Sequence, residues 1–160
     1  MPKNRYPITP AVRFLRSRKI AFKPFVYTYA QHGGTCQAAE ACGFFEHCVI
    51  KTLVLETHEH QALLMLMHGD RQVSTRSLAR FVGAKRLQPV SADRATAVTG
   101  YLVGGISPFG TRRQLPVFVQ ESILSLEHVL INGGKRGFLV EINPRAIVNT
   151  LSAVAVNAAV

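Results

Sequence analysis

The chain has 160 residues, of which 48% are hydrophobic and 18% charged, and its formal net charge is +10. This length fits one domain with a hydrophobic core and is too short for two ordinary domains, and the composition excludes a largely disordered chain. The excess of basic residues favours an anionic partner, nucleic acid above all, although a merely basic surface would give the same charge.

The cysteines and the two ends of the sequence argue against several classes of protein. Cys36, Cys42 and Cys48 are an odd number without CxxC spacing, so neither a zinc site nor a disulfide framework is indicated, and reduced thiols in the cytoplasm are expected. The basic segment 1–10 is followed by no apolar stretch of the kind found in signal peptides. The apolar segment 151–160 is too short to cross a membrane, and we expect it to pack, to fray or to contribute to a subunit contact.

Capping residues and periodicity predict the elements of the first half of the chain. Thr9 followed by Pro10 is typical of a helix start, because a capping hydroxyl precedes a proline at the first helical position. Strand-forming residues alternate farther on, with glycines between the runs. The expected order is a helix from 9 to 18, a strand at 20–30, a helix at 35–43, and strands at 47–56 and 61–69 joined by a turn at 57–60.

The second half predicts more strands, with helices between and after them. Ser91 is expected to cap a helix, and Asn132 with the two glycines after it predicts a hairpin-like turn. The expected order is a helix at 74–83, a short strand at 86–90, a helix at 91–98, strands at 115–121, 128–131 and 137–142, and a helix from 143 to 151. This pattern predicts an α+β fold, a single domain over residues 1–160 with a mixed, curled, barrel-like sheet and flanking helices. Apolar runs outnumber clean alternations, so the sheet should be covered on both faces or closed on itself.

Lys51 stands out within the strand predicted at 47–56. Alternate residues of a strand point to opposite faces, so Lys51 shares a face with Val49, Leu53 and Leu55, which are all apolar. Its side chain either extends to the rim of the sheet or lines a pocket where the ammonium meets an anion or a polarised carbonyl. The pattern alone leaves both interpretations open.

A glycine-rich stretch, "TGYLVGGISPFGTRR" at 99–113, follows the helix predicted at 91–98. Its glycines permit a close approach of the backbone to a ligand, but a turn-rich connection explains them equally well. The stretch matches neither the Walker loop nor GxGxxG. Ser107 lacks the GxSxG context of a serine nucleophile.

Two further clusters carry weaker signals. In "NGGKRG" at 132–137, Lys135 and Arg136 lie beside glycine amides, which suits a phosphate but also an ordinary solvated turn. A metal site can be drawn from four residues, but their spacing matches no metal motif and they fall largely in a predicted turn. These residues are His58, Glu59, His60 and His68. We therefore expect no metal and no cofactor.

Three stretches together identify a family resemblance: "VIKTLVLE" at 49–56, "TGYLVGGISPFG" at 99–110 and "INGGKRG" at 131–137. In this order and spacing they resemble the YbaK-like bacterial aminoacyl-tRNA deacylases, free-standing relatives of the editing domain inserted in bacterial prolyl-tRNA synthetases. The resemblance extends from about residue 9 to 147 and implies a mixed α/β fold around a curled sheet, in agreement with the element order. It is weakest around 32–43, at 57–60 and over the last ten residues.

The resemblance also implies roles for individual residues. Lys51 falls on the essential lysine of the family, and the loop at 104–107 on the floor of its pocket, whose N–H groups would hold the scissile carbonyl. The implied catalytic residues are Lys51, Gly104, Gly105 and Ser107. The implied substrate-binding residues are Tyr27, Ile106, Pro108, Asn132, Gly133 and Gly134. The basic residues that flank the two glycine stretches are expected to contact tRNA: Arg112, Arg113, Lys135 and Arg136.

The implied function is trans-editing, the hydrolysis of the ester between a wrong amino acid and tRNA. A hydrophobic synthetase pocket separates amino acids that differ by one methylene by only about 1–3 kcal/mol, so a second site must sort the products. The best-known branch of the family clears cysteine from proline tRNA, and there the substrate thiol attacks its own ester and gives a cyclic thioester. In other branches a water attacks, and the family supplies no strong nucleophile.

The resemblance leaves the favoured amino acid open. Asn132 stands where relatives more often have serine, and Leu139 where some carry a polar residue. The expected partners are mischarged tRNA and prolyl-tRNA synthetase, with no membrane and a cytoplasmic location. The alternatives are a deacylase for alanine, serine or threonine, a non-catalytic tRNA- or synthetase-binding module, and a small-molecule binding protein.

Overall fold

The computed structural model describes residues 5–160, so the first four residues of the basic segment 1–10 lie outside the described residues. Within the described residues, five α-helices flank one mixed eight-stranded sheet. The helices are α1 (Pro10–Ser17), α2 (Gly34–Cys42), α3 (Thr75–Val82), α4 (Ala92–Thr99) and α5 (Pro144–Leu151), with 3₁₀ helices η1 (Glu46–Cys48) and η2 (Glu121–Ser125). The strands are β1 (Lys23–Val26), β2 (Val49–Thr57), β3 (Ala62–His68), β4 (Leu87–Pro89), β5 (Val117–Gln120), β6 (Val129–Lys135), β7 (Phe138–Ile142) and β8 (Val154–Val156).

The helices begin within one residue of their predicted starts, and all but α2 begin at a side-chain cap. Thr9 Oγ1 accepts a hydrogen bond from the N–H of Val12 at the start of α1. Ser91 Oγ likewise accepts from the N–H of Arg94 at the start of α4. Such bonds satisfy N–H groups that have no partner within the helix.

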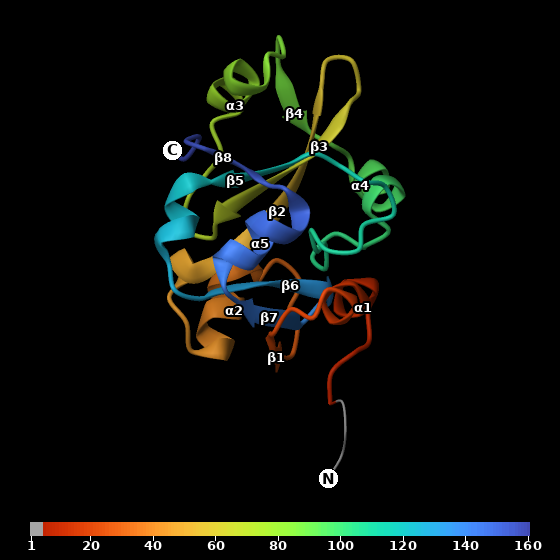
Figure 1. Ribbon diagram of the computed structural model, residues 1–160, viewed down its shortest axis with the longest axis vertical. Coiled ribbons are helices and arrows are strands. Elements are labelled where there is room, and N and C mark those ends of the chain that lie inside the picture. Colours follow the sequence, from red (N-terminus) through yellow and green to blue (C-terminus); the bar gives the residue numbers. More distant parts are fainter. Residues whose placement is uncertain (1–4) are drawn as a thin grey trace.

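The sheet is mixed and curled, as predicted, but it does not close. Its strands lie in the order β1-β7-β6-β2-β3-β5-β8, and β4 pairs with β2 beside this path. The pairs β2–β6, β3–β5 and β5–β8 are parallel and the others antiparallel. Because β1 and β8 end the order, the barrel-like curl leaves two edges. Figure 1 shows α3 and β4 at one end of the molecule and β1, β7 and α1 at the other.

Helices cover both faces of the sheet, which confirms the inference from the apolar runs. On one face α1, α4 and α5 pack against Ile50 and Val54 of β2. On the other face α3 packs against Leu53 and Leu55, and α2 packs against Val49. The odd-numbered residues of β2 therefore share the face that carries α2 and α3, as predicted for the face of Lys51.

The turn predicted at Asn132 is wrong in its position. Strand β6 continues to Lys135 and its register against β7 shifts between Asn132 and Lys135, so the two glycines form a bulge and the chain reverses after the strand. Asn132 Oδ1 accepts hydrogen bonds from the N–H groups of Gly134, at 2.6 Å, and Lys135, at 3.2 Å. Gly134 has φ +101°, a conformation that favours glycine.

Two further segments can be compared with the predictions, one near the start of the chain and one at its end. The strand expected at 20–30 is ordered as a strand only over β1, and the residues after it turn toward the cavity described below. The segment 151–160 packs on the domain: β8 pairs with β5, and Ala159 forms a bridge with Val73. In the described part of the chain, no helix combines the length and apolarity needed to cross a membrane.

Candidate active site

A gap in strand pairing opens the sheet beside Lys51. One edge of β2 pairs with β3 over residues 50–56. On its other edge, β2 pairs with β6 only at Val49 and Ile50 and with β4 only from Leu55 to Thr57. Residues 51–53 have no strand partner on that edge among the described strands. The backbone and side chains of this interval are therefore available to line a cavity.

A cavity of about 450 Å³ occupies this gap. It lies between the first residues of α2, the unpaired interval of β2, the glycine-rich loop and the bulge of β6. Its lining residues are Tyr27, Tyr29, Gln31, His32, Gly34, Thr35, Ala38, Val49, Ile50, Lys51, Thr52, Leu53, Val103, Gly104, Ile106, Asn132, Arg136 and Leu139. The three stretches that carried the family resemblance thus meet around one hollow.

Lys51 contributes a partly buried ammonium group to this cavity. Burial lowers the pKa of Lys51, and the nearby carboxylates of Glu46 and Asp70 oppose that shift. Among the described residues, Lys51 forms no ion pair. Glu46 instead accepts a hydrogen bond from the hydroxyl of Thr35, at 2.6 Å. A cation without a paired anion in a partly desolvated hollow is suited to bind a group that carries or develops negative charge.

Two side chains from the β6–β7 hairpin hold the glycine-rich loop in place. Asn132 Nδ2 donates to the carbonyl of Gly104 at 3.2 Å, and Arg136 Nε donates to the carbonyl of Val103 at 2.9 Å. At Gly105 the two backbones approach so closely that a Cβ would lie 2.8 Å from the nitrogen of Arg136. Only glycine fits there without displacing the hairpin.

The loop presents backbone donors at the cavity. The N–H groups of Gly104 and Ile106 donate to no other group of the described residues, and both residues line the hollow. The N–H of Gly105 instead donates to the carbonyl of Leu102 at 2.8 Å. Val103 also lines the hollow and its N–H likewise donates to no group of the described residues, so the loop residues with free N–H groups at the hollow are Val103, Gly104 and Ile106.

Ser107 and Pro108 lie outside the cavity lining. Both are buried, and Ser107 Oγ accepts a hydrogen bond from the N–H of Phe109. Gly133 packs against the ring of Phe138, and Gly134 packs against Tyr101. The structure thus places these four residues behind the site, where they shape the loop and the bulge.

The predicted tRNA-contacting residues separate into two groups. Arg136 lines the cavity and its guanidinium lies over the ring of Tyr29, 5.5 Å from the ring centre. Lys135, next to it, is exposed. Arg112 and Arg113 are exposed too, and their N–H groups donate to the last turn of α4.

One wall of the cavity is apolar. Leu139 lines it and packs with Ala38 and Val49, and Tyr27 packs on the same cluster. Burial raises the pKa of the Tyr27 phenol, and Cys42 and Tyr29 add to this shift, so Tyr27 is neutral at physiological pH. This wall suits a small uncharged side chain, with Lys51 and the free amides on the other sides.

Thr52 was missed by the sequence reasoning. Its hydroxyl is buried at the cavity and has no hydrogen-bond partner in the structure. Only the strand face that carries Lys51 was predicted to line a pocket, and by alternation Thr52 points to the other face. It becomes part of the cavity because the strand edge is unpaired there, which no local pattern in the sequence reveals.

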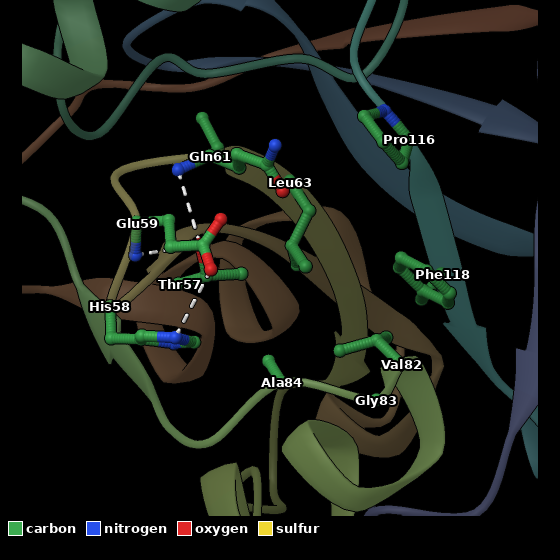
Figure 2. Close-up of a pocket in the computed structure, with 11 residues that line it drawn as sticks. Thr57, His58, Glu59, Gln61, Leu63, Val82, Gly83, Ala84, Pro116 and Phe118 are labelled. Atoms are coloured by element: carbon green, nitrogen blue, oxygen red, sulfur yellow. Dashed lines mark hydrogen bonds and ion pairs between the residues drawn. The ribbon is translucent and has the colours of Figure 1, made fainter.

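A second hollow, of about 330 Å³, lies at the turn between β2 and β3 (Figure 2). Thr57 Oγ1 accepts hydrogen bonds from the N–H groups of Glu59 and Gln61, and His58 forms an ion pair with Glu59 at 3.4 Å. Leu63 and Phe118 form its apolar side (Figure 2). None of the residues predicted to act on a substrate lies there.

The histidines considered as a metal site do not gather as drawn. His60 pairs with Glu56 at 3.5 Å, and His68 lies instead with His47 and Asp70, with ligand atoms within 4.8 Å of one another. Both ring nitrogens of His68 are already hydrogen-bonded, to the carbonyl of His47 and the hydroxyl of Ser122, each at 2.7 Å. His47 Nδ1 is bonded to Asp70 at 2.9 Å. This cluster serves the packing of η1 on the end of β3.

The fold and the cavity together define a small α+β domain that brings an unpaired lysine, free backbone donors and an apolar wall around one small hollow. The family model of the aminoacyl-tRNA editing domain matches residues 31–150. Over 142 residues the chain is 27% identical to EbsC of Enterococcus faecalis, which is assigned as a Cys-tRNA(Pro)/Cys-tRNA(Cys) deacylase, and the match covers 88% of this chain and 87% of EbsC.

Two further comparisons agree with this match. A proline–tRNA ligase of Pelotomaculum thermopropionicum is 31% identical over 114 residues, which are 69% of this chain but 20% of the ligase. A crystal structure of a protein assigned as a trans-editing enzyme for prolyl-tRNA synthetase has a TM-score of 0.83 at 22% identity, with 96% of this chain and 99% of that chain covered. At 22% identity, this structural similarity shows that the fold is shared and no more.

The chain belongs to the aminoacyl-tRNA editing domain family. This assignment confirms the resemblance drawn from the three sequence stretches and the α+β fold that it implied. It also confirms aminoacyl-tRNA deacylation as the kind of reaction.

Proposed function

We propose that residues 1–160 act as one editing domain that cleaves the ester of mischarged tRNA in trans, with cysteine on proline tRNA as the preferred substrate. Among the relatives, EbsC carries an assignment to this substrate. The proposal takes that specificity to the present chain. A protein with this substrate acts in the cytoplasm, where tRNAs are charged, and prolyl-tRNA synthetase is the proposed second partner.

One observation carries the proposal: Lys51, Gly104 and Ile106 line the same cavity. An ester carbonyl gains negative charge on oxygen as it is attacked. The free N–H groups of Gly104 and Ile106 are suited to accept that charge, and the ammonium of Lys51 is suited to hold the ester and the terminal ribose beside them. Preorganised donors of this kind stabilise the transition state more than the substrate.

The apolar wall supports cysteine over larger or charged residues. A cysteinyl side chain fits against Leu139 and Val49, and its thiol then lies near its own ester carbonyl. In the proposed step, the sulfur attacks the carbonyl carbon and the ester C–O bond breaks. The thiol proton goes to the ribose oxygen, so the products are a cyclic thioester and tRNA with a free terminal hydroxyl. The protein contributes orientation and charge stabilisation, and no residue of its own forms a bond.

The proposal is tested with a panel of mischarged tRNAs that carry labelled cysteine, alanine, serine or threonine on proline tRNA. We expect the wild-type protein to release cysteine fastest. Lys51→Ala is expected to reduce release at least a hundredfold while the circular dichroism spectrum stays the same. If another small amino acid is released fastest, the proposed preference for cysteine is wrong, but the protein is still a deacylase.

A matched control keeps the test specific. Lys19→Ala removes an exposed basic side chain that does not line the cavity, and its rate should equal that of the wild type. If the intact protein releases no amino acid from any tRNA but binds tRNA, a non-catalytic binding module replaces the proposed enzyme.

A further inference from the structure

A second basic surface lies apart from the residues already assigned to tRNA. Between Asp70 and Asp93 the sequence holds five basic residues and no carboxylate. They are Arg71, Arg76, Arg80, Lys85 and Arg86. This short segment therefore contributes +5 to the formal net charge of +10.

Helix α3 and the loop that follows it present four of these cations to solvent. Its buried side, Leu78 and Ala79, packs on the sheet, and Arg76 and Arg80 lie one helical turn apart on its exposed side. Together with Lys85 and Arg86 of the following loop they line a hollow of about 420 Å³. The other lining residues are Thr75, Ala79, Ala84 and Leu87, so no acidic side chain contributes to the surface. We call this hollow with its four cations the α3 basic groove.

The cations of the α3 basic groove have no internal partners. None of the four forms an ion pair with a carboxylate of the described residues. Surface cations in proteins usually alternate with acidic residues, and four exposed unpaired cations repel one another. This arrangement stabilises the bound state of a polyanion rather than the folded protein itself.

The groove lies on the same face of the sheet as Lys51. Leu53 and Leu55 of β2 pack against α3. Lys51 is two residues before Leu53, so the alternation of the strand places it on the same face. Strand β4, which contacts α3, pairs with the end of β2 from Leu55 to Thr57. At about 3.3 Å per residue, the four to six residues between Lys51 and the part of β2 that pairs with β4 span roughly 13–20 Å along the strand, and the groove lies beside that part.

We propose that the α3 basic groove binds the phosphate backbone of the tRNA acceptor arm whose aminoacyl end occupies the Lys51 cavity. The inference rests on the proposed function, because it takes aminoacyl-tRNA as the substrate. A distance of roughly 13–20 Å corresponds to about four to six base steps at 3.4 Å per step. Three of the four cations are arginines, and one planar guanidinium group can donate two parallel hydrogen bonds to a single phosphate. An acidic protein surface is the competing occupant, but a row of exposed cations without an apolar centre fits repeated phosphates better.

The test compares a patch variant with a charge-matched control. Arg80→Gln/Arg86→Gln removes two cations of the groove and keeps good helix formers, and Lys23→Gln/Arg145→Gln removes two exposed cations elsewhere. Binding of uncharged proline tRNA is measured over a salt series, and deacylation is measured on full-length Cys-tRNA and on the cysteinyl ester of a short CCA oligonucleotide.

We expect the patch variant to bind tRNA about tenfold more weakly and to lose about two units of the salt slope. Its KM for full-length Cys-tRNA should rise by a similar factor, with kcat unchanged and with the turnover of the short ester unchanged. The control variant should match the wild type. Equal tRNA affinity and salt slope in the patch and control variants would overturn the proposal.

Two other outcomes are separable. If the patch variant loses affinity for prolyl-tRNA synthetase and keeps its tRNA affinity, the groove binds protein and the proposal is wrong. If the wild type cleaves neither ester while the patch variant still loses tRNA affinity and salt slope, the proposed deacylase function fails and the RNA groove stands.

Discussion

Asn132 and Gly104 are 28 residues apart in the sequence, and a hydrogen bond from Asn132 Nδ2 to the carbonyl of Gly104 joins them at 3.2 Å. The other end of the same amide accepts from the N–H groups of Gly134 and Lys135. One side chain thus fixes both the bulge of β6 and the loop that carries the free amides of the cavity. We therefore expect Asn132 to act on the substrate through the loop, as a positioning residue.

Asn132→Ala should reduce both stability and deacylation. The change leaves the partly buried N–H of Gly134 without its acceptor, which costs about 1–2 kcal/mol of unfolding free energy, and it releases the carbonyl of Gly104. We expect kcat for Cys-tRNA deacylation to fall more than KM rises, because the donors of the loop act on the transition state. Urea denaturation and steady-state kinetics measure the two effects.

Asn132→Asp separates the two ends of the amide. The carboxylate still accepts from Gly134 and Lys135 but offers no donor to Gly104. Stability should therefore stay closer to the wild type than in Asn132→Ala, while kcat falls in both. A kcat for Asn132→Asp equal to that of the wild type would mean that the bond to Gly104 does not position the loop.

Gly105→Ala tests the close approach of the loop to the hairpin. The added Cβ would lie 2.8 Å from the backbone nitrogen of Arg136 and 2.9 Å from the carbonyl carbon of Lys135, and backbone atoms cannot move aside cheaply. We expect a loss of about 1–3 kcal/mol of stability and reduced deacylation. Gly83→Ala is the control: its φ of 79° strains alanine, but an added Cβ meets nothing within 4 Å. It should lose stability without losing activity.

The fold was predictable where the signal is local. The hydroxyl of Ser91 and the Thr9-Pro10 step are followed directly by α4 and α1, because capping depends on neighbours in sequence. The bulge of β6 was not predictable, since Asn-Gly-Gly is equally compatible with a hairpin turn and the choice depends on pairing with β7. Strand β8 was also missed as a strand, because its residues take that form only by pairing with β5.

The candidate site divides in the same way. The three sequence stretches led to Lys51, Gly104 and Asn132, which line one cavity. No pattern in the sequence separates Ile106, which lines the cavity, from Ser107, which is buried behind it, since the side-chain directions in an irregular loop follow no period. Thr52 and the α3 basic groove emerge only when strand pairing and helix packing are known.

Lys51→Met should abolish deacylation without destabilising the protein. Burial lowers the pKa of Lys51 below its ordinary 10.5, so the folded state binds this proton less strongly than the unfolded state does. The charged group therefore opposes folding at neutral pH, and this opposition is relieved as the pH rises toward 10.5. Thermal unfolding at neutral pH should give Lys51→Met a melting temperature equal to or above that of the wild type.

The activity that depends on Lys51 should fall as the pH rises, whereas the contribution of Lys51 to stability becomes more favourable. In the proposed mechanism deacylation needs the ammonium, so the enzyme-dependent rate, corrected for base hydrolysis of the ester, should fall as the pH rises through a value below 10.5. Lys51→Arg keeps its charge over this range, and any residual activity should lack the fall. A wild-type rate that stays constant up to pH 10.5 would contradict a charged Lys51 in the reaction.

His68 should make the protein less stable in weak acid. Burial lowers the pKa of its imidazole below the ordinary 6.5, with contributions of the same sign from His47 and Arg71, while the carbonyl of His47 and the charge of Asp70 oppose the shift. The unfolded state therefore binds more protons, so this contribution to stability is fully present above about pH 6.5 and is lost as the pH falls through the lower folded pKa. His68→Gln, which keeps one donor and one acceptor, should flatten the melting temperature between about pH 7.5 and pH 5. His128→Gln, which changes a largely exposed imidazole, should keep the wild-type slope, and equal slopes in all three proteins would exclude His68 as the titrating group.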